Sequence, residues 1–280
     1  MWPFKPSWMS LTYTKAQKAV AKETDQIKLA EIAKTAPRME TRKAAVKKLT
    51  DQTALYDIAK SEEFGDIRMA AAERLTNQDL AQGIYADIAS NSTHDIRQMK
   101  AVSKMTDQIL LARIAVTNRH SHVSEEAVKR LHEESALADV AQNANNPYVR
   151  AKAVRKITNQ NLLAEYAKNG STAYVRDAAV RNLSDQNQDL LGHIARYDED
   201  WSVRYMAVEK VSDQTLVQEV YSDIVRIIVE NHLVVKDLGE RIRIAIVEKL
   251  TNKGVLANLA EKDLNMSVKR AAKIRLEELN

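Results

Sequence analysis

The chain of 280 residues contains no cysteine. Disulfide bonds and thiolate metal sites are therefore excluded, and the fold must be held by packing and hydrogen bonds. Glycine, proline and aromatic residues are also scarce, with six glycines, four prolines and 5% aromatics. This composition suits packed helices and leaves few of the residues that sheet-rich folds use at their turns. Because a chain without cysteine is compatible with a reducing compartment, we expect a cytoplasmic protein.

Long apolar runs are absent as well. No stretch approaches the roughly 20 apolar residues of a membrane-spanning helix, and Pro3 and Pro6 interrupt the apolar start before any signal-peptide core. The 42 basic and 38 acidic residues nearly balance, to a net charge of +4, as on an ordinary soluble surface. No glycine-rich phosphate loop, zinc-binding helix motif or nucleophile elbow occurs. We therefore expect no enzymatic activity, no cofactor, no metal and no integral membrane segment.

What the sequence does contain is a repeat. A Thr/Ser-Asp/Asn-Gln triplet recurs, most often at a step of 26 residues, with copies that begin at Thr24, Thr50, Thr76, Thr106, Thr158, Ser184, Ser212 and, degraded to Thr-Asn-Lys, Thr251. Between Thr106 and Thr158 one copy has decayed to His132-Glu133-Glu134, and a last unit closes near Glu277. A fixed period of this length is the signature of a repeat architecture.

The residues before each triplet recur with helical spacing. The fifth residue before it is small in all units but one: Ala45, Ala71, Ala101, Ala127, Ala153, Ala179, Ala207, Ile246 and Ala272. The residue directly before it is always apolar: Leu49, Leu75, Met105, Leu131, Ile157, Leu183, Val211, Leu250 and Leu276. A spacing of four places both positions on one face of an α-helix of about three turns.

The triplet itself begins a second short helix. Its Thr or Ser can cap free backbone N–H groups, and its Asp suits the positive end of the helix dipole. Leu29, Ile32 and Ala33 then follow with a spacing of three and four. Because hairpins of such short helices are not stable alone, they must stack. The pattern therefore predicts an all-α fold, an α-solenoid of about nine stacked helical hairpins with a period near 26 residues.

The helix before the triplet, Val/Ile-Arg-x-x-Ala-Val-x-x-Leu after a short acidic turn, resembles the second helix of HEAT-like repeats in their short bacterial form, close to the variant leucine-rich repeat. The resemblance covers roughly residues 15–280. It implies a right-handed superhelix whose second helices line the concave side. It also implies an Asp six residues before the helix Arg, a spacing found at Asp198 and Arg204 and at Asp237 and Arg243.

Residues 1–14 form a separate lead segment rich in aromatic side chains, with Trp2, Phe4 and Trp8. These side chains can fold over the exposed end of the first hairpin. Alternatively, they form a docking peptide or a peripheral membrane anchor. Residues 15–280 form the repeat domain.

The repeat is most disturbed around residues 222–240, where an insertion lengthens one unit. Its apolar side chains exceed what a standard hairpin can bury, and the candidate partner-binding residues among them are Ile227, Ile228, Leu233, Val234 and Val235. If part of this surface is exposed, it is a partner or dimer surface. The alternative is that the longer helix packs against an adjacent unit or against the N-terminal aromatics.

Basic residues recur at the second position before the triplet. Stacked, they form a basic stripe: Lys48, Arg74, Lys104, Arg130, Lys156, Lys210 and Lys249. A positive stripe can attract an acidic partner or a nucleic-acid backbone. Alternatively, each basic residue only stabilises the negative end of its own helix. The Arg eight residues before the triplet borders the buried face, so we expect it to bond the preceding hairpin.

Two further clusters are candidates for chemistry. His94 and His120 occupy equivalent turns, with His122 nearby, and are expected to be solvated rather than to bind zinc, which needs about four ligands. Some HEAT-like proteins are DNA glycosylases that use an acid and aromatics on the concave face, and Asp198, Asp200 and Trp201 beside Arg204 resemble that arrangement. Acidic turns next to a tryptophan are, however, common.

The function expected from the sequence is a non-catalytic interaction scaffold that binds a protein or peptide through the solenoid surface. The alternative is a HEAT-like protein that binds nucleic acid through the basic stripe. One form of this alternative is a protein that resembles DNA glycosylases. The alternative predicts binding that weakens steeply with salt and is lost on charge reversal of Lys104, Arg130 and Lys156. The sequence leaves the oligomeric state open.

Overall fold

The computed structural model describes residues 7–9, 13–61, 64–230 and 238–280. Within these residues the regular elements are nineteen α-helices and one short 3₁₀ helix, without a strand, so the all-α prediction is confirmed. The chain divides into two compact units, Met1–Val149 and Arg150–Asn280. The boundary falls inside α11 (Pro147–Val154), and each unit is described by itself.

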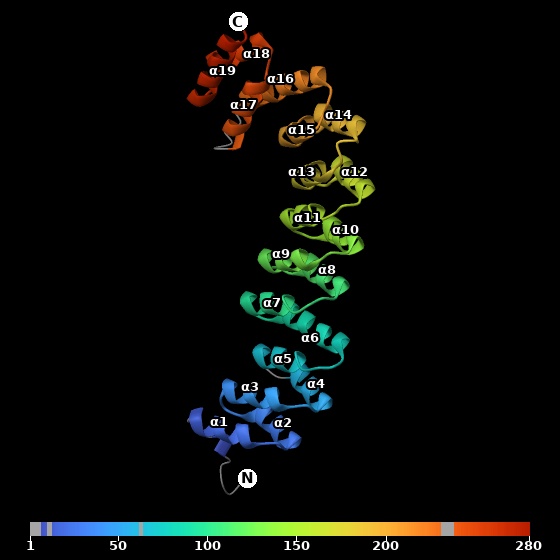
Figure 1. Ribbon diagram of the computed structural model, residues 1–280, viewed down its shortest axis with the longest axis vertical. Coiled ribbons are helices and arrows are strands. Elements are labelled where there is room, and N and C mark those ends of the chain that lie inside the picture. The colour runs from blue at the N-terminus through green and yellow to red at the C-terminus, as the bar shows by residue number, and fades with distance from the viewer. Residues whose placement is uncertain (1–6, 10–12, 62–63, 231–237) are drawn as a thin grey trace. The chain divides into compact units, whose positions relative to one another are not determined.

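Unit 1 is a stack of helical hairpins in two layers. Its elements are η1 (Ser7–Met9), α1 (Tyr13–Lys22), α2 (Gln26–Thr35), α3 (Met39–Lys48), α4 (Gln52–Ser61), α5 (Gly65–Ala72), α6 (Gln78–Asn91), α7 (Asp95–Val102), α8 (Gln108–Thr117), α9 (Ser121–Arg130) and α10 (Glu134–Asn143). The odd-numbered helices pack on one another in one layer and the even-numbered helices in the other (Figure 1). This is the solenoid-like stacking that the repeat predicts.

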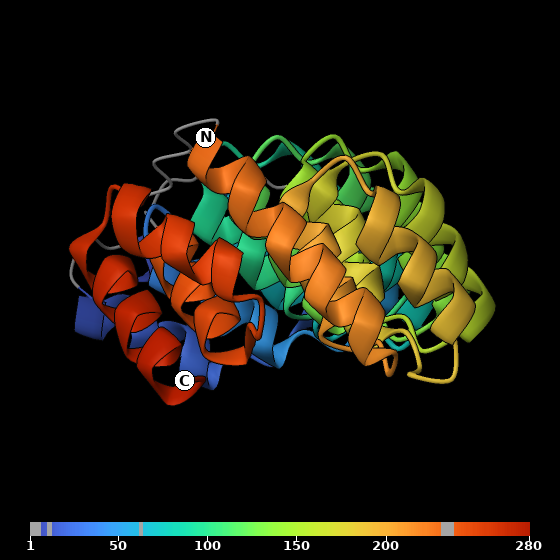
Figure 2. The ribbon, with the colours of Figure 1, turned by 90° about the horizontal axis from the view of Figure 1, so that it is seen from above.

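Unit 2 consists of helical hairpins of the same kind up to α16, which is longer than the other described helices. Its elements after α11 are α12 (Gln160–Asn169), α13 (Ala173–Asn182), α14 (Gln188–Tyr197), α15 (Trp201–Val208), α16 (Gln214–Glu230), α17 (Leu238–Lys249), α18 (Lys253–Lys262) and α19 (Met266–Glu278). In the view of Figure 2, α16 is the long orange helix of this unit. It packs on α14 and α15, while α17 packs on α19.

The repeated small residues form the centre of both stacks. All nine residues named above at the fifth position before a triplet are fully buried, including the single isoleucine, Ile246. The nine apolar residues directly before the triplets are buried as well, apart from Leu276 in the last helix, which is partly exposed. Because alanine has so small a side chain, neighbouring helices can approach closely at each of these positions. The predicted core positions are therefore confirmed.

Helix capping differs from the sequence-based expectation. In most units the N-cap is the second residue of the triplet rather than its Thr or Ser, whereas α14 begins after Asn187. Asp25 accepts from the N–H of Ile27 at 2.9 Å, and Asp107 from the N–H of Leu110 at 2.9 Å. Asn77, Asn159 and Asn252 cap α6, α12 and α18 in the same way. Asp and Asn are strong N-caps, which leaves the Thr or Ser free for another contact.

That contact is a ladder of glutamine side chains between successive hairpins. The Oε1 of Gln26 accepts from the N–H of Thr50 at 2.7 Å and from its hydroxyl at 3.1 Å. Gln52 repeats both bonds with Thr76, and its Nε2 also donates to the Arg74 carbonyl at 3.4 Å. An amide both donates and accepts, so one side chain satisfies backbone groups that the end of a helix leaves without partners.

The ladder also explains the irregular repeat lengths. In α6 the docking residue is Gln82, one turn after Gln78 of the triplet, and it bonds Thr106 at 2.8 Å. In α16 it is Gln218, one turn after Gln214, and it bonds Thr251 at 2.9 Å. Gln188 takes this role in α14 and bonds Ser212. In α6 the added residues therefore lie within the helix, before its docking glutamine, and in α14 they lie in the turn before the helix.

A second ladder pairs buried arginines with acids of the following hairpin. Arg176 Nε lies 2.7 Å from Asp198 Oδ2, and Arg243 Nε lies 3.0 Å from Asp263 Oδ2. Asp198 therefore bonds Arg176, which lies 22 residues earlier in the sequence. It does not bond Arg204, six residues later, whose Nε donates to the Ala195 carbonyl. The expected spacing is present, but the pairing joins successive hairpins.

One rung of this ladder is uncharged. Gln98 and Ser124 stand where other units have arginine, and Asn118 stands where Asp198 stands later. Gln98 Nε2 donates to the Ser92 carbonyl at 2.8 Å, and Asn118 Nδ2 donates to the Ala89 carbonyl at 2.9 Å. Neutral amides therefore replace the ion pair at this point of unit 1.

In the described part of the chain, no helix is both long enough and apolar enough to cross a membrane.

Candidate functional site

The basic stripe predicted from the sequence is largely engaged in stacking. Arg74 Nε donates to the Leu49 carbonyl at 2.9 Å, and Arg130 Nε donates to the Met105 carbonyl at 2.9 Å. Lys48 and Lys210 likewise donate to backbone carbonyls of the preceding hairpin. These donors satisfy carbonyls at the end of the neighbouring helix, where positive charge is also favoured by the helix dipole.

The remaining stripe residues have other surroundings. Lys104 Nζ lies 3.0 Å from Glu73 Oε1, and Lys249 pairs with Glu209. Burial lowers the pKa of Lys156. Partial burial and these pairings reduce the charge that the stripe offers to a ligand.

The residues considered for a glycosylase-like site also have structural partners. Both carboxylate oxygens of Asp198 accept from Arg176, and its side chain is only 6% exposed. Asp200 caps α15 by accepting from the N–H of Ser202 at 2.8 Å, and Trp201 is partly buried at the start of that helix. Asp198 therefore anchors the turn to the preceding hairpin, and Asp200 starts the next helix.

The turn histidines lie on the surface of unit 1. His122 Nε2 is 2.9 Å from Asp95 Oδ2, and the rings of His120 and His122 are 5.8 Å apart. The pKa of Asp95 lies below its usual value because the Ile96 N–H, first, and then His122 bond its carboxylate. Among the described residues, no group of three or more acidic or histidine side chains is placed to hold a metal ion.

The structure describes only part of the predicted partner surface. Trp8 lies in η1, which packs on α1, and is partly buried. Ile227 is partly buried on α16. Ile228 also belongs to α16, but its side chain is outside the described part, as are Trp2, Phe4, Leu233, Val234 and Val235. Their role in partner binding stays a prediction.

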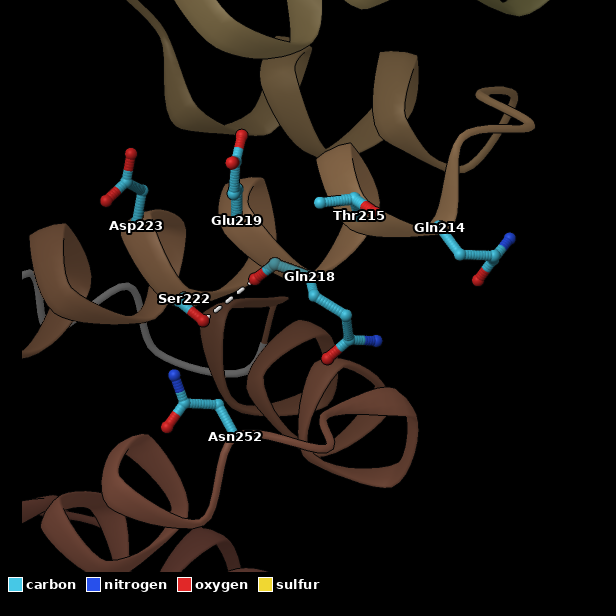
Figure 3. A pocket seen from close by; sticks show the side chains of 7 residues that line it. All are labelled: Gln214, Thr215, Gln218, Glu219, Ser222, Asp223 and Asn252. Carbon is cyan, nitrogen blue, oxygen red and sulfur yellow. Dashed lines mark hydrogen bonds between the residues drawn. The ribbon is translucent and has the colours of Figure 1, made fainter.

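A hollow in unit 2 lies along α16 (Figure 3). It has a volume of about 700 Å³ and is lined by Gln214, Thr215, Gln218, Glu219, Ser222, Asp223 and Asn252. A second hollow of about 180 Å³ adjoins it at Ser222 and Asp223 and adds Val225, Arg226, Val255, Asn258 and Leu259. We call the two together the α16 groove.

The sequence of α16 separates this face from the core. Leu216, Val217, Val220, Tyr221, Ile224 and Val225 recur with helical spacing and are buried, whereas polar residues occupy the positions between them. In Figure 3, Gln218 and Ser222 lie on the side of α16 that faces Asn252, while the carboxylates of Glu219 and Asp223 project to the opposite side. Amide side chains therefore lie on one side of α16, and carboxylates lie on the other.

Three side chains fix α16 beneath the groove. The buried Tyr221 hydroxyl donates to Glu209 at the end of α15, and Lys249 of α17 pairs with the same carboxylate. Burial, and then the hydrogen bond to Glu209, raise the pKa of Tyr221, so this phenol stays protonated. Three helices are thus joined through one carboxylate.

Charges around the groove are mixed. Asp223 lies 3.0 Å from Arg226 and 3.5 Å from Arg204, and Glu219 lies 3.4 Å from Arg196. The Ser222 hydroxyl donates to the Gln218 carbonyl at 2.8 Å, and no histidine or lysine is among the described lining residues that could activate it.

The partner-binding residues predicted from the sequence begin at Ile227, and their role stays a prediction. The groove is lined by other residues, polar side chains from Gln214 to Asp223, which the sequence did not single out. The available signal was the distance from Gln218 to Thr251, which exceeds the 24 residues between other docking pairs. No protein-family model and no curated protein sequence matches this chain.

Proposed function

We propose that the protein is a HEAT-like interaction scaffold without catalytic activity, and that a peptide segment of its partner occupies the α16 groove. The groove carries the proposal, because it is a hollow between one face of α16 and the start of α18, lined mainly by polar side chains. The hairpins elsewhere use their repeated polar residues to bind each other. A cytoplasmic location stays a prediction.

The lining residues support a peptide as ligand. Amide side chains such as Gln214, Asn252 and Asn258 both donate and accept, so they can pair with the N–H and C=O groups of an extended backbone. Val255 is partly exposed at the end of the groove and can contact an aliphatic side chain. Polar walls with a small apolar contact are typical of peptide recognition that relies on main-chain hydrogen bonds.

The nucleic-acid alternative has less support. It rests on the basic stripe, whose residues largely bond the preceding hairpin or an acidic neighbour, as at Arg130 and Lys104. A phosphate backbone would have to compete with those contacts. We therefore place the peptide scaffold first.

Panning a peptide library against the full chain tests the proposal. Selected peptides are expected to lose at least tenfold in affinity when Ser222→Arg fills the junction of the two hollows, because the long side chain occupies the ligand's space. Ser267→Arg adds the same group to an exposed site of α19 and should leave binding unchanged. Selected peptides that bind both variants as tightly as the unmodified chain would place the ligand elsewhere.

A further inference from the structure

Two adjoining pockets open at the turns of unit 1 that connect α6 with α7 and α8 with α9. Their volumes are about 200 Å³ and 330 Å³, and both are lined by Asn91 and Ser92. Arg97 lines the first and Arg119 the second. These pockets belong to unit 1 and include no residue of the α16 groove.

The two arginines carry charge that the described residues do not neutralise. Neither guanidinium forms an ion pair with a described carboxylate. Two acids of the hairpin of Arg97 are engaged with other residues, Asp87 with Arg68 and Asp95 with His122. The buried side-chain pair between these hairpins is formed by the neutral Gln98 and Asn118. Arg97 and Arg119 are therefore not part of the buried contact between the hairpins.

Both side chains are nevertheless held in place. Arg97 lies across the backbone of Gly65, where an added Cβ would be only 2.4 Å from Arg97 Cδ. Its Nη1 lies 3.4 Å from the Ser92 hydroxyl. Arg119 Nε donates to His120 Nε2 at 3.1 Å, which leaves its two terminal amino groups available. Arg97, which lies against Gly65 and Ser92, loses less side-chain freedom when it binds an anion than a fully exposed arginine does.

The pocket walls suit oxyanions. Among the described lining residues there is no carboxylate to repel an anion and no aromatic ring. The Thr93 hydroxyl has no hydrogen-bond partner among the described residues and can donate beside Arg97. The corresponding turn in unit 2 is instead acidic, with Asp198, Glu199 and Asp200. The cationic pockets are therefore a local departure from the repeat.

We propose that these pockets bind an acidic peptide segment, with one carboxylate or phosphate side chain on Arg97 and a second on Arg119. Guanidinium groups bind both kinds of oxyanion through paired hydrogen bonds. A single-stranded nucleic acid fits less well, because such ligands depend on aromatic side chains for base stacking.

Fluorescence anisotropy with the full chain tests this proposal. The probe is a short labelled peptide of alternating aspartate and serine, and its asparagine counterpart is expected not to bind. Arg97→Gln and Arg119→Gln should each weaken binding of the acidic peptide at least tenfold. Arg270→Gln removes the same charge from an exposed position in unit 2 and should change affinity less than twofold. Equal losses in all three variants would show unspecific charge attraction and overturn the proposal.

Two further variants leave the charge of residue 97 unchanged. They distinguish the contribution of side-chain geometry from that of charge. Gly65→Ala should displace Arg97 and weaken binding about as much as Arg97→Gln, while circular dichroism shows an intact helical fold. Should the alanine variant not fold, Arg97→Lys makes the same comparison, since lysine keeps the charge but not the paired donors.

Phosphoserine and nucleic-acid probes identify the source of the anion. A phosphoserine peptide that binds and responds to Arg97→Gln and Arg119→Gln supports the same site with phosphate as the preferred oxyanion. Tighter binding of single-stranded DNA than of both acidic peptides, at equal charge, would overturn the assignment to a peptide.

Discussion

Replacing Asp198 by alanine is expected to lower the free energy of unfolding of unit 2 by about 3 kcal/mol, because it leaves a buried arginine without its main partner. The side chains of Arg176 and Asp198 are 9% and 6% exposed. Two hydrogen bonds, at 2.7 and 2.9 Å, join them. The Gly170 carbonyl, 3.1 Å from Arg176 Nη1, still bonds the guanidinium, so we expect the lower end of the range for broken buried pairs. Urea unfolding followed by circular dichroism measures the loss.

Glu199→Gln is the matched control for this variant. Glu199 contacts the same guanidinium at 3.0 Å, but its side chain is 84% exposed. Exposed ion pairs contribute only about 0–1 kcal/mol, because solvent screens them. Similar losses for Asp198→Ala and Glu199→Gln would contradict the structural importance of the buried pair.

The neutral pair Gln98 and Asn118 of unit 1 suggests a double variant that avoids the loss of stability expected for Asp198→Ala. Arg176→Gln combined with Asp198→Asn copies the pair Gln98 and Asn118, which joins the same positions of earlier hairpins. The double variant leaves no buried charge, so it should be clearly more stable than Asp198→Ala. A double variant as unstable as the sum of its two single changes would show that the neutral rung depends on surroundings found only in unit 1.

The helical stack could be predicted from the sequence because its cause is local and repeated. Ala101 or Leu131 needs only its distance from the triplet to be assigned to the buried face, and both are buried. The same is true of hairpin order, because short helices joined by short turns pack on their sequence neighbours. Fold class therefore followed from spacing alone.

The pairing between hairpins could not be derived in this way. A spacing of six between Asp198 and Arg204 is visible in the sequence, but the bond to Arg176 depends on how one hairpin sits on the next. The α16 groove was hidden for the same reason. Its existence depends on which glutamine of α16 docks the following hairpin, and both Gln214 and Gln218 have suitable chemistry.

The second large loss of stability is expected when the docking glutamine of α6 is replaced. Gln82→Ala should cost about 1–3 kcal/mol, the usual cost of leaving buried polar groups without partners. Gln82 is 7% exposed, accepts from the N–H of Thr106 at 2.8 Å and lies 3.4 Å from the Lys104 carbonyl. Its loss removes the contact that joins α6 to the end of α7.

Gln78 provides the control within the same helix. It belongs to the recognisable triplet, yet it is exposed and bonds only the nearby Leu75 carbonyl, at 3.3 Å. Gln78→Ala should therefore change stability by no more than about 0.5 kcal/mol. Hydrogen exchange gives a local readout, because the Thr106 amide should exchange faster in Gln82→Ala and not in Gln78→Ala. A larger loss of stability for Gln78→Ala than for Gln82→Ala would contradict this assignment. It would mean that the glutamine of the triplet docks the next hairpin, one turn earlier than the observed bond from Gln82 to Thr106.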